Sequence, residues 1–353
     1  MEWKSFSTSE ETRKMSSPLQ AISWLLGAAG KEKSFRANPI IGSQRLNRMG
    51  FHRKRVELAA KMASMRRSRL ASKLDSADRA AIDEQGFVIK SDYLPPETFD
   101  ALRAELFGKP IAAREMRQGQ TVTRMASLAA AGAQTGFSVA LSPKVGDLMA
   151  YAAGRSGAPV ICIQTVIANP SDPQRDQQTE MHSDTFHATA KLWLFLTDVG
   201  DEDGPFVYVP GSHKLTRERL EWEYVQSLTA CDDSRLHHSL GSFRVREQEL
   251  QDLGYGPPRR ITVKANTLVV ADTHGFHHRA ASARPTTRVE LYGYLRRNPF
   301  IPWNGFDVTA LPGIRGRQLD FFYRYLDIRR RYFGKDSIWK DVGPVPIDSP
   351  AQI

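Results

Sequence analysis

The chain has 353 residues, of which 41% are apolar and 25% are charged, and it holds only two cysteines, Cys162 and Cys231. This composition is typical of a soluble globular protein and excludes a fully disordered chain, a disulfide scaffold and a cysteine-rich metal site. The net charge is +10, and the whole excess falls on residues 1–75, which carry 16 Lys and Arg against 6 Asp and Glu.

Residues 18–29 place apolar side chains at Leu19, Ile22, Leu25 and Leu26, a spacing that predicts a helix, and residues 56–74 predict a basic helix. The character of the sequence changes near residue 75, so we interpret residues 1–75 as a basic helical extension. We expect it either to pack on the main domain or to bind an anionic membrane surface, which co-sedimentation of residues 1–75 with liposomes would test.

No apolar run reaches the roughly 18 residues that cross a bilayer, and no secretory leader opens the sequence. With only two cysteines, the sequence favours a cytoplasmic protein, peripheral at the membrane if the extension binds lipid. Nucleic acid is not expected as a partner, because residues 76–353 are balanced in charge and no base-stacking motif stands among the basic residues.

The main domain begins with a predicted helix after residue 76, a strand at 87–90 and a helix at 96–106. Beyond residue 159 the sequence predicts short strands separated by Gly, Pro, Asp and Ser turns, at residues 160–168, 191–197, 206–209, 260–263, 268–271 and 289–295. Many short strands without βαβ alternation favour a mainly β fold with flanking helices, a sandwich or jelly roll. We expect this domain to cover residues 76–300 and residues 301–353 to form a C-terminal extension packed on it, with an amphipathic helix at 319–335.

The segment TEMHSDTFH carries the first candidate ligands. His182 and Asp184 are two residues apart, so on an extended strand both side chains project from the same face. A second cluster, ADTHGFHHRAAS, supplies His274, His277 and His278 directly after an apolar strand. Two histidines and one carboxylate on one face of an ion form the triad of iron(II) oxygenases, which leaves positions open for co-substrate and dioxygen.

Arg288 opens a further apolar strand, eleven residues after His277. Its planar guanidinium can hold a carboxylate through two parallel hydrogen bonds, which suits the far end of a 2-oxo diacid. The alternative is a structural pair with a nearby acid such as Glu290.

These residues resemble the phytanoyl-CoA dioxygenase-like family of Fe(II)/2-oxoglutarate-dependent oxygenases. The matching features are MHSDTFH, LTDVGDEDGPFVYVPGSHK, GFHHRAASARPTTR and the opening GFVIKSDYLPPETFDALRAEL. The resemblance covers roughly residues 80–297, and its ordered combination of motifs is more specific than any single motif. It implies a double-stranded β-helix, the cupin-like jelly roll.

The resemblance further implies that His182, Asp184 and His277 hold Fe(II) and that Arg288 binds 2-oxoglutarate. The family's distal histidine stands eleven residues before its arginine, which favours His277 over His274, while His278 should point to the opposite face. Gln164 and Trp193 are additional candidates for contact with the co-substrate, with packing as the alternative for Trp193.

Because the carboxylate of Asp184 is present, the resemblance implies hydroxylation rather than halogenation, with succinate and CO2 as co-products. The expected substrate is a small molecule or a lipid-linked one. Residues 214–258 and the tail after Asn298 are the expected sources of substrate selection. Two alternatives remain: a hydroxylase of an envelope or lipid-derived substrate at the membrane surface, and a jelly-roll binding module without turnover.

Overall fold

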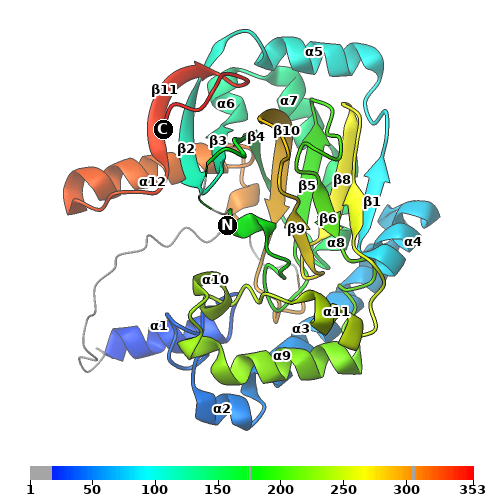
Figure 1. Cartoon of the computed structure of the whole chain (residues 1–353), viewed down its shortest axis with the longest axis vertical. Helices are drawn as coiled ribbons and strands as arrows, with labels where there is room; N and C mark the ends of the chain where they lie inside the picture. The colour runs from blue at the N-terminus through cyan, green and yellow to red at the C-terminus, as the bar shows by residue number, and fades with distance from the viewer. Residues whose placement is uncertain (1–17, 173, 175, 304–306) are drawn as a thin grey trace.

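A computed structural model describes residues 18–172, 174, 176–303 and 307–353. An eight-stranded antiparallel sheet has the order β1-β8-β5-β10-β4-β3-β2-β11, and a three-stranded sheet has the order β7-β6-β9 (Figure 1). Two antiparallel sheets with flanking helices form the jelly-roll architecture predicted from the sequence, so the predicted fold class is confirmed.

The strands of the large sheet are β1 Phe87–Lys90, β2 Pro110–Gln118, β3 Thr121–Ala126, β4 Val160–Ala168, β5 Ala190–Phe195, β8 Thr267–Asp272, β10 Thr286–Leu295 and β11 Lys340–Pro346. Those of the small sheet are β6 Phe206–Tyr208, β7 Arg259–Ile261 and β9 His277–Arg279.

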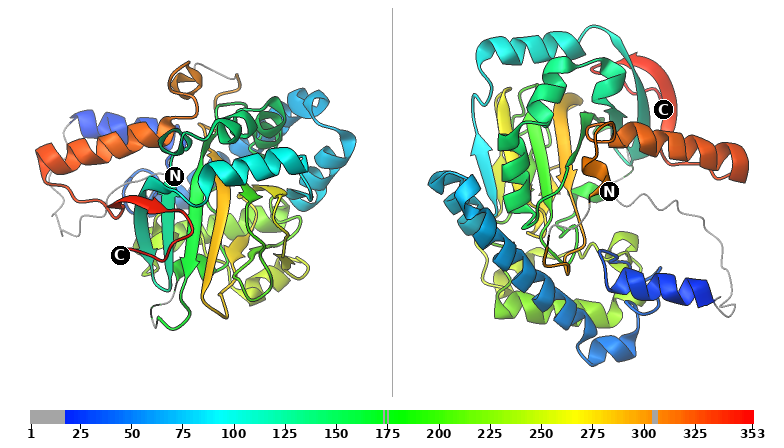
Figure 2. Two further views of the ribbon diagram at one scale, coloured as in Figure 1. Left: turned by 90° about the horizontal axis from the view of Figure 1, so that it is seen from above. Right: turned by 180° about the vertical axis from the view of Figure 1, so that it is seen from behind.

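The α-helices are α1 Pro18–Ala28, α2 Gln44–Arg48, α3 Phe51–Leu70, α4 Ser76–Gln85, α5 Pro96–Leu106, α6 Leu128–Ala131, α7 Gln134–Ala140, α8 Pro143–Ala152, α9 Arg217–Thr229, α10 Leu236–Ser239, α11 Glu247–Asp252 and α12 Gln318–Phe333. Short 3₁₀ turns lie at Ala71–Lys73, Gln177–Thr179, Ala230–Asp232 and Val308–Ala310. Helices α6, α7 and α8 cover the rear face of the large sheet, and α3 and α9 lie side by side below it (Figure 2).

The two faces of β10 show how the sheet divides core from site. Val289 and Leu291 belong to the apolar cluster that also contains Leu148 and Met149 of α8. The alternate residues Arg288, Glu290 and Tyr292 project to the opposite face, because successive side chains of a strand point to opposite sides. That second face meets the small sheet, and it carries the polar residues proposed from the sequence.

Basic residues of the N-terminal segment bind the main chain of the β domain. Arg66 donates from Nε to the Gly154 carbonyl at 2.6 Å, and Arg67 donates to the carbonyls of Tyr151 and Ala152 at 3.0 and 2.6 Å. These carbonyls end helix α8, where cations are favoured by the helix dipole and satisfy its last acceptors. Some of the basic residues that give residues 1–75 their net positive charge therefore bind main-chain carbonyls of the main domain.

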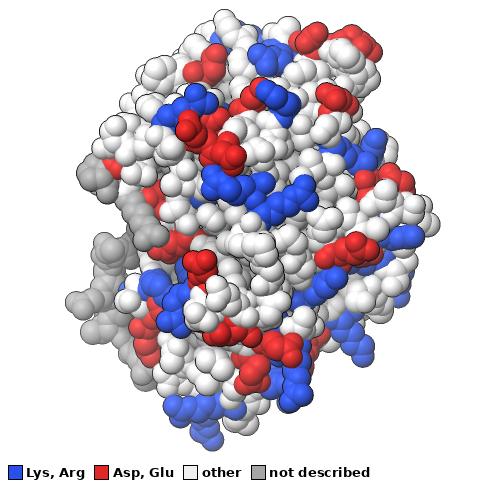
Figure 3. Space-filling view, turned by 45° about the vertical axis from the view of Figure 1, so that its right-hand side comes forward, with Lys and Arg blue, Asp and Glu red and all other residues white. Residues whose placement is uncertain are grey.

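The charges that remain at the surface are mixed in sign. On the face shown in Figure 3, Lys and Arg lie in small groups among Asp and Glu rather than in one basic stripe. Within the described residues, none of the helices is long and apolar enough to cross a membrane. The predicted division at residues 75 and 300, and the predicted lipid contact of the extension, stay predictions.

The sequence located several elements closely and missed others. Strands β1 and β4 and helix α5 have the predicted bounds, and β5, β6, β7, β8, β10, α1, α3 and α12 differ from prediction only near their ends. The prediction included none of β2, β3, β9 and β11. Strand β2 contains Arg114 and Glu115, which are buried although charged residues are usually exposed, so residue type gave no signal for this strand.

Arg124 of β3 joins the last strand to the sheet. Its side chain is 1% exposed and pairs with the fully buried Glu115 at 2.6 Å. It also donates to the carbonyls of Pro346 and Ile347 at 2.9 and 3.1 Å and to those of Ser349 and Pro350 at 2.9 and 2.7 Å. One buried guanidinium therefore fixes the segment that follows β11.

We expect Arg124→Gln to lower the free energy of unfolding by about 3–5 kcal/mol, because Glu115 would keep a buried charge without its partner. Urea denaturation followed by circular dichroism measures this loss. The control is Arg117→Gln on β2, which breaks an ion pair to Asp172 whose arginine is 43% exposed and should cost about 1 kcal/mol or less. Equal losses in the two variants would contradict the role assigned to Arg124.

Candidate metal centre

The candidate ligands meet where the large and small sheets are joined. The backbone of His182 forms two hydrogen bonds with that of His277, each 2.9 Å between nitrogen and oxygen. The amide of Asp184 donates to the Thr273 carbonyl at 3.0 Å. The main chain thus brings the HSD segment beside strand β9, although the two segments are far apart in the sequence.

Both imidazoles are oriented by carbonyl groups two residues before them. Nδ1 of His182 lies 2.7 Å from the Glu180 carbonyl, and Nδ1 of His277 lies 2.8 Å from the Gly275 carbonyl. A carbonyl accepts only, so each Nδ1 carries a proton, and in the neutral ring each Nε2 keeps a lone pair for a metal. Burial lowers the pKa of His182 to about 3, which keeps this imidazole neutral and able to bind a metal.

Asp184 faces both imidazoles through one oxygen. Its Oδ1 lies 3.7 Å from Nε2 of His182 and 3.6 Å from Nε2 of His277, while Oδ2 pairs with the Lys191 ammonium at 2.7 Å. Burial would raise the pKa of Asp184, but Lys191 and the histidines outweigh it and hold that pKa well below its usual value. The carboxylate is therefore ionised, with Oδ1 left to face the two nitrogens.

These three side chains fit a metal ion. Their ligand atoms all lie within 4.8 Å of one another, and they form a group of the kind that could hold a metal. Nε2 of His277 is buried without a hydrogen-bond partner among the described residues, a cost that proteins normally avoid. Two neutral imidazoles and one carboxylate are the donors of a 2-His-1-carboxylate iron(II) site, so the donor set fits iron.

Arg288 lies on the same inner face and is only 7% exposed. Its Nη1 donates to the Gly204 carbonyl at 2.9 Å, and its Nε lies 3.0 Å from Oε2 of Glu290. Gln164 donates to the other oxygen of Glu290 at 2.6 Å. The local pair with Glu290, foreseen as the alternative, is thus formed, and Gln164 is directed to that acid.

Burial raises the pKa of Glu290, and this effect exceeds the opposing effects of Arg288 and Gln164. Burial also lowers the pKa of Arg288, which Glu290 partly opposes. A fully buried acid therefore lies directly beside the arginine proposed to bind the co-substrate.

Trp193 lies between the sheets in a group of aromatic rings. Its ring centroid is 4.5 Å from that of Phe206 and 6.2 Å from that of Tyr292, and Phe206 in turn lies 5.6 Å from the His277 ring. The side chain of Trp193 is 7% exposed. It therefore contributes to a dry, apolar wall beside the triad, in a packing role compatible with contact to a bound co-substrate.

The two competing histidines face elsewhere. His278 neighbours His277 in strand β9 and so projects to the opposite face, as predicted. His274 is buried with its Nε2 3.7 Å from Oε1 of Glu223, and its Nδ1 lies 3.3 Å from the His213 carbonyl. His274 thus belongs to a different polar network.

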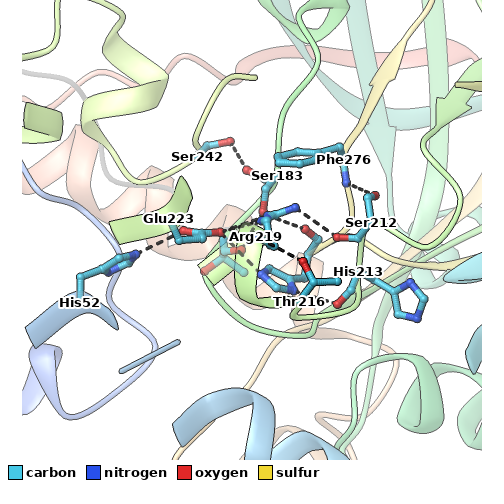
Figure 4. A network of polar contacts seen from close by, with 12 residues as sticks. His52, Ser183, Ser212, His213, Thr216, Arg219, Glu223, Ser242 and Phe276 are labelled. Carbon is cyan, nitrogen blue, oxygen red and sulfur yellow. Dashed lines mark hydrogen bonds and ion pairs between the residues drawn. The ribbon is translucent and has the colours of Figure 1, made fainter. Parts of the chain in front are cut away.

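Glu223 is the centre of that network, between His52 and Arg219 (Figure 4). It accepts from Nη2 of Arg219 at 3.0 Å and lies 3.3 Å from Nε2 of His52. Arg219 also donates to the carbonyls of Ser212 and His274 at 3.1 and 3.2 Å, and Ser212 Oγ accepts from the Phe276 amide at 2.7 Å. The network therefore fixes the backbone that leads into His277.

Sequence reasoning missed two lysines at this centre. Lys191 precedes Trp193 by two residues on β5, so the shared face of the strand was the available signal. Lys33 donates to the backbone carbonyl of Asp184 at 2.5 Å. Lys33 is far from Asp184 in the sequence, so no sequence pattern predicted this contact. It depends on how residues 29–35 pack against the β domain.

Comparison with known proteins supports the sequence resemblance. Residues 82–264 match the family model described as phytanoyl-CoA dioxygenase (PhyH). This match spans more than half of the chain and contains His182 and Asp184, and it ends before His277 and Arg288. No curated protein matches the sequence.

Solved structures with similar folds include two enzymes of nogalamycin biosynthesis. The epimerase SnoN, in complex with Fe3+, alpha ketoglutarate and nogalamycin RO, is 17% identical, with a TM-score of 0.42 over 69% of this chain and 91% of SnoN. The carbocyclase SnoK is 20% identical, with a TM-score of 0.39 over 65% of this chain and 85% of SnoK. HygX from Streptomyces hygroscopicus, with nickel, 2-oxoglutarate and hygromycin B bound, is 14% identical, with a TM-score of 0.40 over 69% and 94%.

We expect Gly275→Ala to disturb the candidate metal centre. A Cβ at this position would lie 1.8 Å from Tyr208 Oη, and Tyr208 stacks on the His277 ring at 6.4 Å between centroids. The substitution should weaken binding of iron(II) or its substitute cobalt(II) at least tenfold, as measured by anaerobic titration of the visible spectrum. Gly146→Ala on α8, where a Cβ would meet nothing within 4 Å, is the control and should bind as the unchanged chain does. Unchanged binding in Gly275→Ala would contradict the expectation.

Proposed function

Because the chain belongs to the phytanoyl-CoA dioxygenase family of iron(II)- and 2-oxoglutarate-dependent oxygenases, we propose that it hydroxylates an unactivated C–H bond of a small-molecule substrate. The observation that carries this proposal is the His182–Asp184–His277 group, whose ligand atoms lie within 4.8 Å of one another. We assign these three residues to iron and Arg288 to 2-oxoglutarate.

When bound, iron and 2-oxoglutarate supply the oxidising chemistry, in which dioxygen is consumed and succinate and CO2 are released as the substrate is oxidised. The chain's own residues hold and orient these groups. The two histidines present neutral Nε2 atoms, and Asp184 supplies the negative charge that partly balances the cation. Lys191 keeps Oδ2 occupied, which favours binding of the metal through Oδ1 alone.

Arg288 would hold the distal carboxylate of 2-oxoglutarate at the inner end of the site. Trp193 and Phe206 would exclude water from the reacting centre, where unproductive oxidation would otherwise compete. The carboxylate of Asp184 fills the position that a halogenating relative would leave for halide, which supports hydroxylation over halogenation.

The first test is an anaerobic titration with iron(II) and 2-oxoglutarate, followed through the visible charge-transfer band. We expect a band in the unchanged chain, loss of the band in His277→Ala, and a requirement for at least tenfold more 2-oxoglutarate in Arg288→Ala. His278→Ala removes a neighbouring histidine on the opposite face of β9 and is the matched control, which should keep the band.

Two outcomes would oppose the proposal. Absence of a band in the unchanged chain would favour a binding module without turnover. A band that survives in His277→Ala but is lost in His274→Ala would transfer the distal ligand to the other histidine. Succinate release in a substrate screen then separates turnover from binding alone.

We expect Glu290→Gln to bind 2-oxoglutarate about three- to tenfold more tightly than the unchanged chain. The amide keeps the size of the side chain but removes a negative charge 3.0 Å from Arg288, and a like charge near an anion site costs affinity. Titration of the same band measures the effect. Weaker binding would mean that Glu290 is needed to orient Arg288, and would contradict the charge argument.

A further inference from the structure

A second group of polar atoms without hydrogen-bond partners comes from three parts of the chain, one of which directly follows Asp184. Among the described residues, the unpaired buried atoms include Nε and Nη1 of Arg55, Nε of Arg296, Nε2 of His187 and Oγ1 of Thr185. Buried polar atoms of native proteins are nearly always hydrogen-bonded, so a cluster of orphans points to a missing ligand. The site described above uses none of these side chains.

Arg55 is the most deeply placed cation of this cluster. It projects from α3, is 5% exposed, and uses only Nη2, which donates to the carbonyls of Gly30 and Glu32 at 3.3 and 2.7 Å. Within the described part of the chain, it has no ion pair. Its guanidinium stacks over the Phe186 ring at 4.2 Å from the centroid, a contact that uses the face of the group and leaves its edge donors free.

Arg296 lies close to Arg55, because its Nη2 donates to the Lys31 carbonyl at 2.5 Å, between the Gly30 and Glu32 carbonyls that accept from Arg55. His187 comes from a third part of the chain. Burial and then the charge of Arg296 lower the pKa of His187 well below its usual value, with smaller effects from His274 and Arg55. Burial lowers the pKa of Arg55 to about 9, with Glu32 opposing this and Arg296 adding to it. The charges of these side chains therefore interact, which agrees with their lying in one region of the fold.

This region adjoins the proposed iron ligands. His187 follows Asp184 by three residues, and Phe186 contacts both His187, at 4.9 Å between ring centroids, and Arg55. Arg296 follows directly on β10, eight residues after Arg288, at the opposite end of the strand from the proposed 2-oxoglutarate arginine. A group bound here would lie on the far side of the metal centre from the co-substrate.

Arg55 is buried and Arg296 is half-buried, and within the described residues neither forms an ion pair with a carboxylate. An interior cation without an anionic partner is costly, so an anionic group of a ligand would stabilise both. The N–H donors of a guanidinium can bind two oxygen atoms of one carboxylate or phosphate group. The carboxylate of Glu32 accepts from the backbone amides of Lys33 and Ser34 at 3.1 and 3.0 Å, so at least part of its capacity is used elsewhere.

We propose that Arg55, Arg296 and His187 form an oxyanion site that anchors a carboxylate or phosphate group of the substrate beside the metal centre. This inference rests on the proposed function and narrows it to an anionic small molecule. The anchor also gives residues 18–75 a part in the site, since Arg55 belongs to that segment.

The test is thermal unfolding of the metal-free protein in sodium phosphate, sodium butyrate or sodium chloride at equal ionic strength. We expect phosphate or butyrate to raise Tm above the chloride value by about 3 °C at ten times the dissociation constant. Stabilisation by phosphate alone would indicate a phosphorylated substrate, and stabilisation by butyrate would indicate a carboxylate. If Arg288→Ala shows the same rise in Tm, Arg288 is excluded as the group that binds the added anion.

Arg296→Gln and Arg55→Lys should each lose most of this shift. Arg260→Gln, on the surface strand β7, removes the same charge and should keep it. If Arg55→Lys does not fold, Arg296→Gln still decides. No shift with either anion, or an equal shift in Arg296→Gln, would overturn the oxyanion site. Failure of the proposed function would appear separately, as absence of the iron and 2-oxoglutarate band in the unchanged chain. Arg296→Gln should keep that band even though it loses the anion-dependent rise in Tm.

Discussion

The candidate metal centre depends on the pair of 2.9 Å backbone hydrogen bonds between His182 and His277. They join the loop that carries His182 to strand β9 of the small sheet and so hold the two histidines side by side. Main-chain bonds place the ligand positions, and the carbonyls of Glu180 and Gly275 then turn the rings. The donor atoms are thus oriented by the backbone before any ion is bound, which limits the reorganisation that binding requires.

Asp272, at the end of β8, extends this control to the N-terminal segment. It is fully buried, pairs with Arg67 of α3 at 2.7 Å, and accepts from the amides of Thr189 and His274 at 3.1 and 3.0 Å. One carboxylate therefore contacts the chain that follows Asp184, the chain that precedes His277, and helix α3. A segment that looked like a charged appendage in composition contributes to the support of the site.

The sequence was informative where chemistry and periodicity agreed. Strand β4 is a mostly apolar run rich in β-branched residues, and this composition gave its bounds. The spacing of His182 and Asp184 predicted that both lie on one face. The sequence was less informative where burial ran against residue type, as with Glu115 in β2, or where a contact joined distant segments, as with Lys33 and Asp184. The ion pair of Arg288 with Glu290 was foreseen only as an alternative, because spacing cannot tell whether an arginine on a strand faces a ligand or its neighbour.

The order of the strands in the large sheet has a consequence for how the site comes into being during folding. Phe87 pairs with Ala271 and Gln118 with Thr121, so one pair of neighbouring strands closes a very long loop while another forms locally. When a long loop closes, the chain loses conformational entropy before the new strand contacts compensate for the loss. Sheets that pair strands far apart in the sequence therefore form slowly. The hairpin of β2 and β3 can form early, whereas the ends of β8 and β9 that surround His277 are reached late. A metal held by His182, Asp184 and His277 would therefore bind only after these long loops have closed.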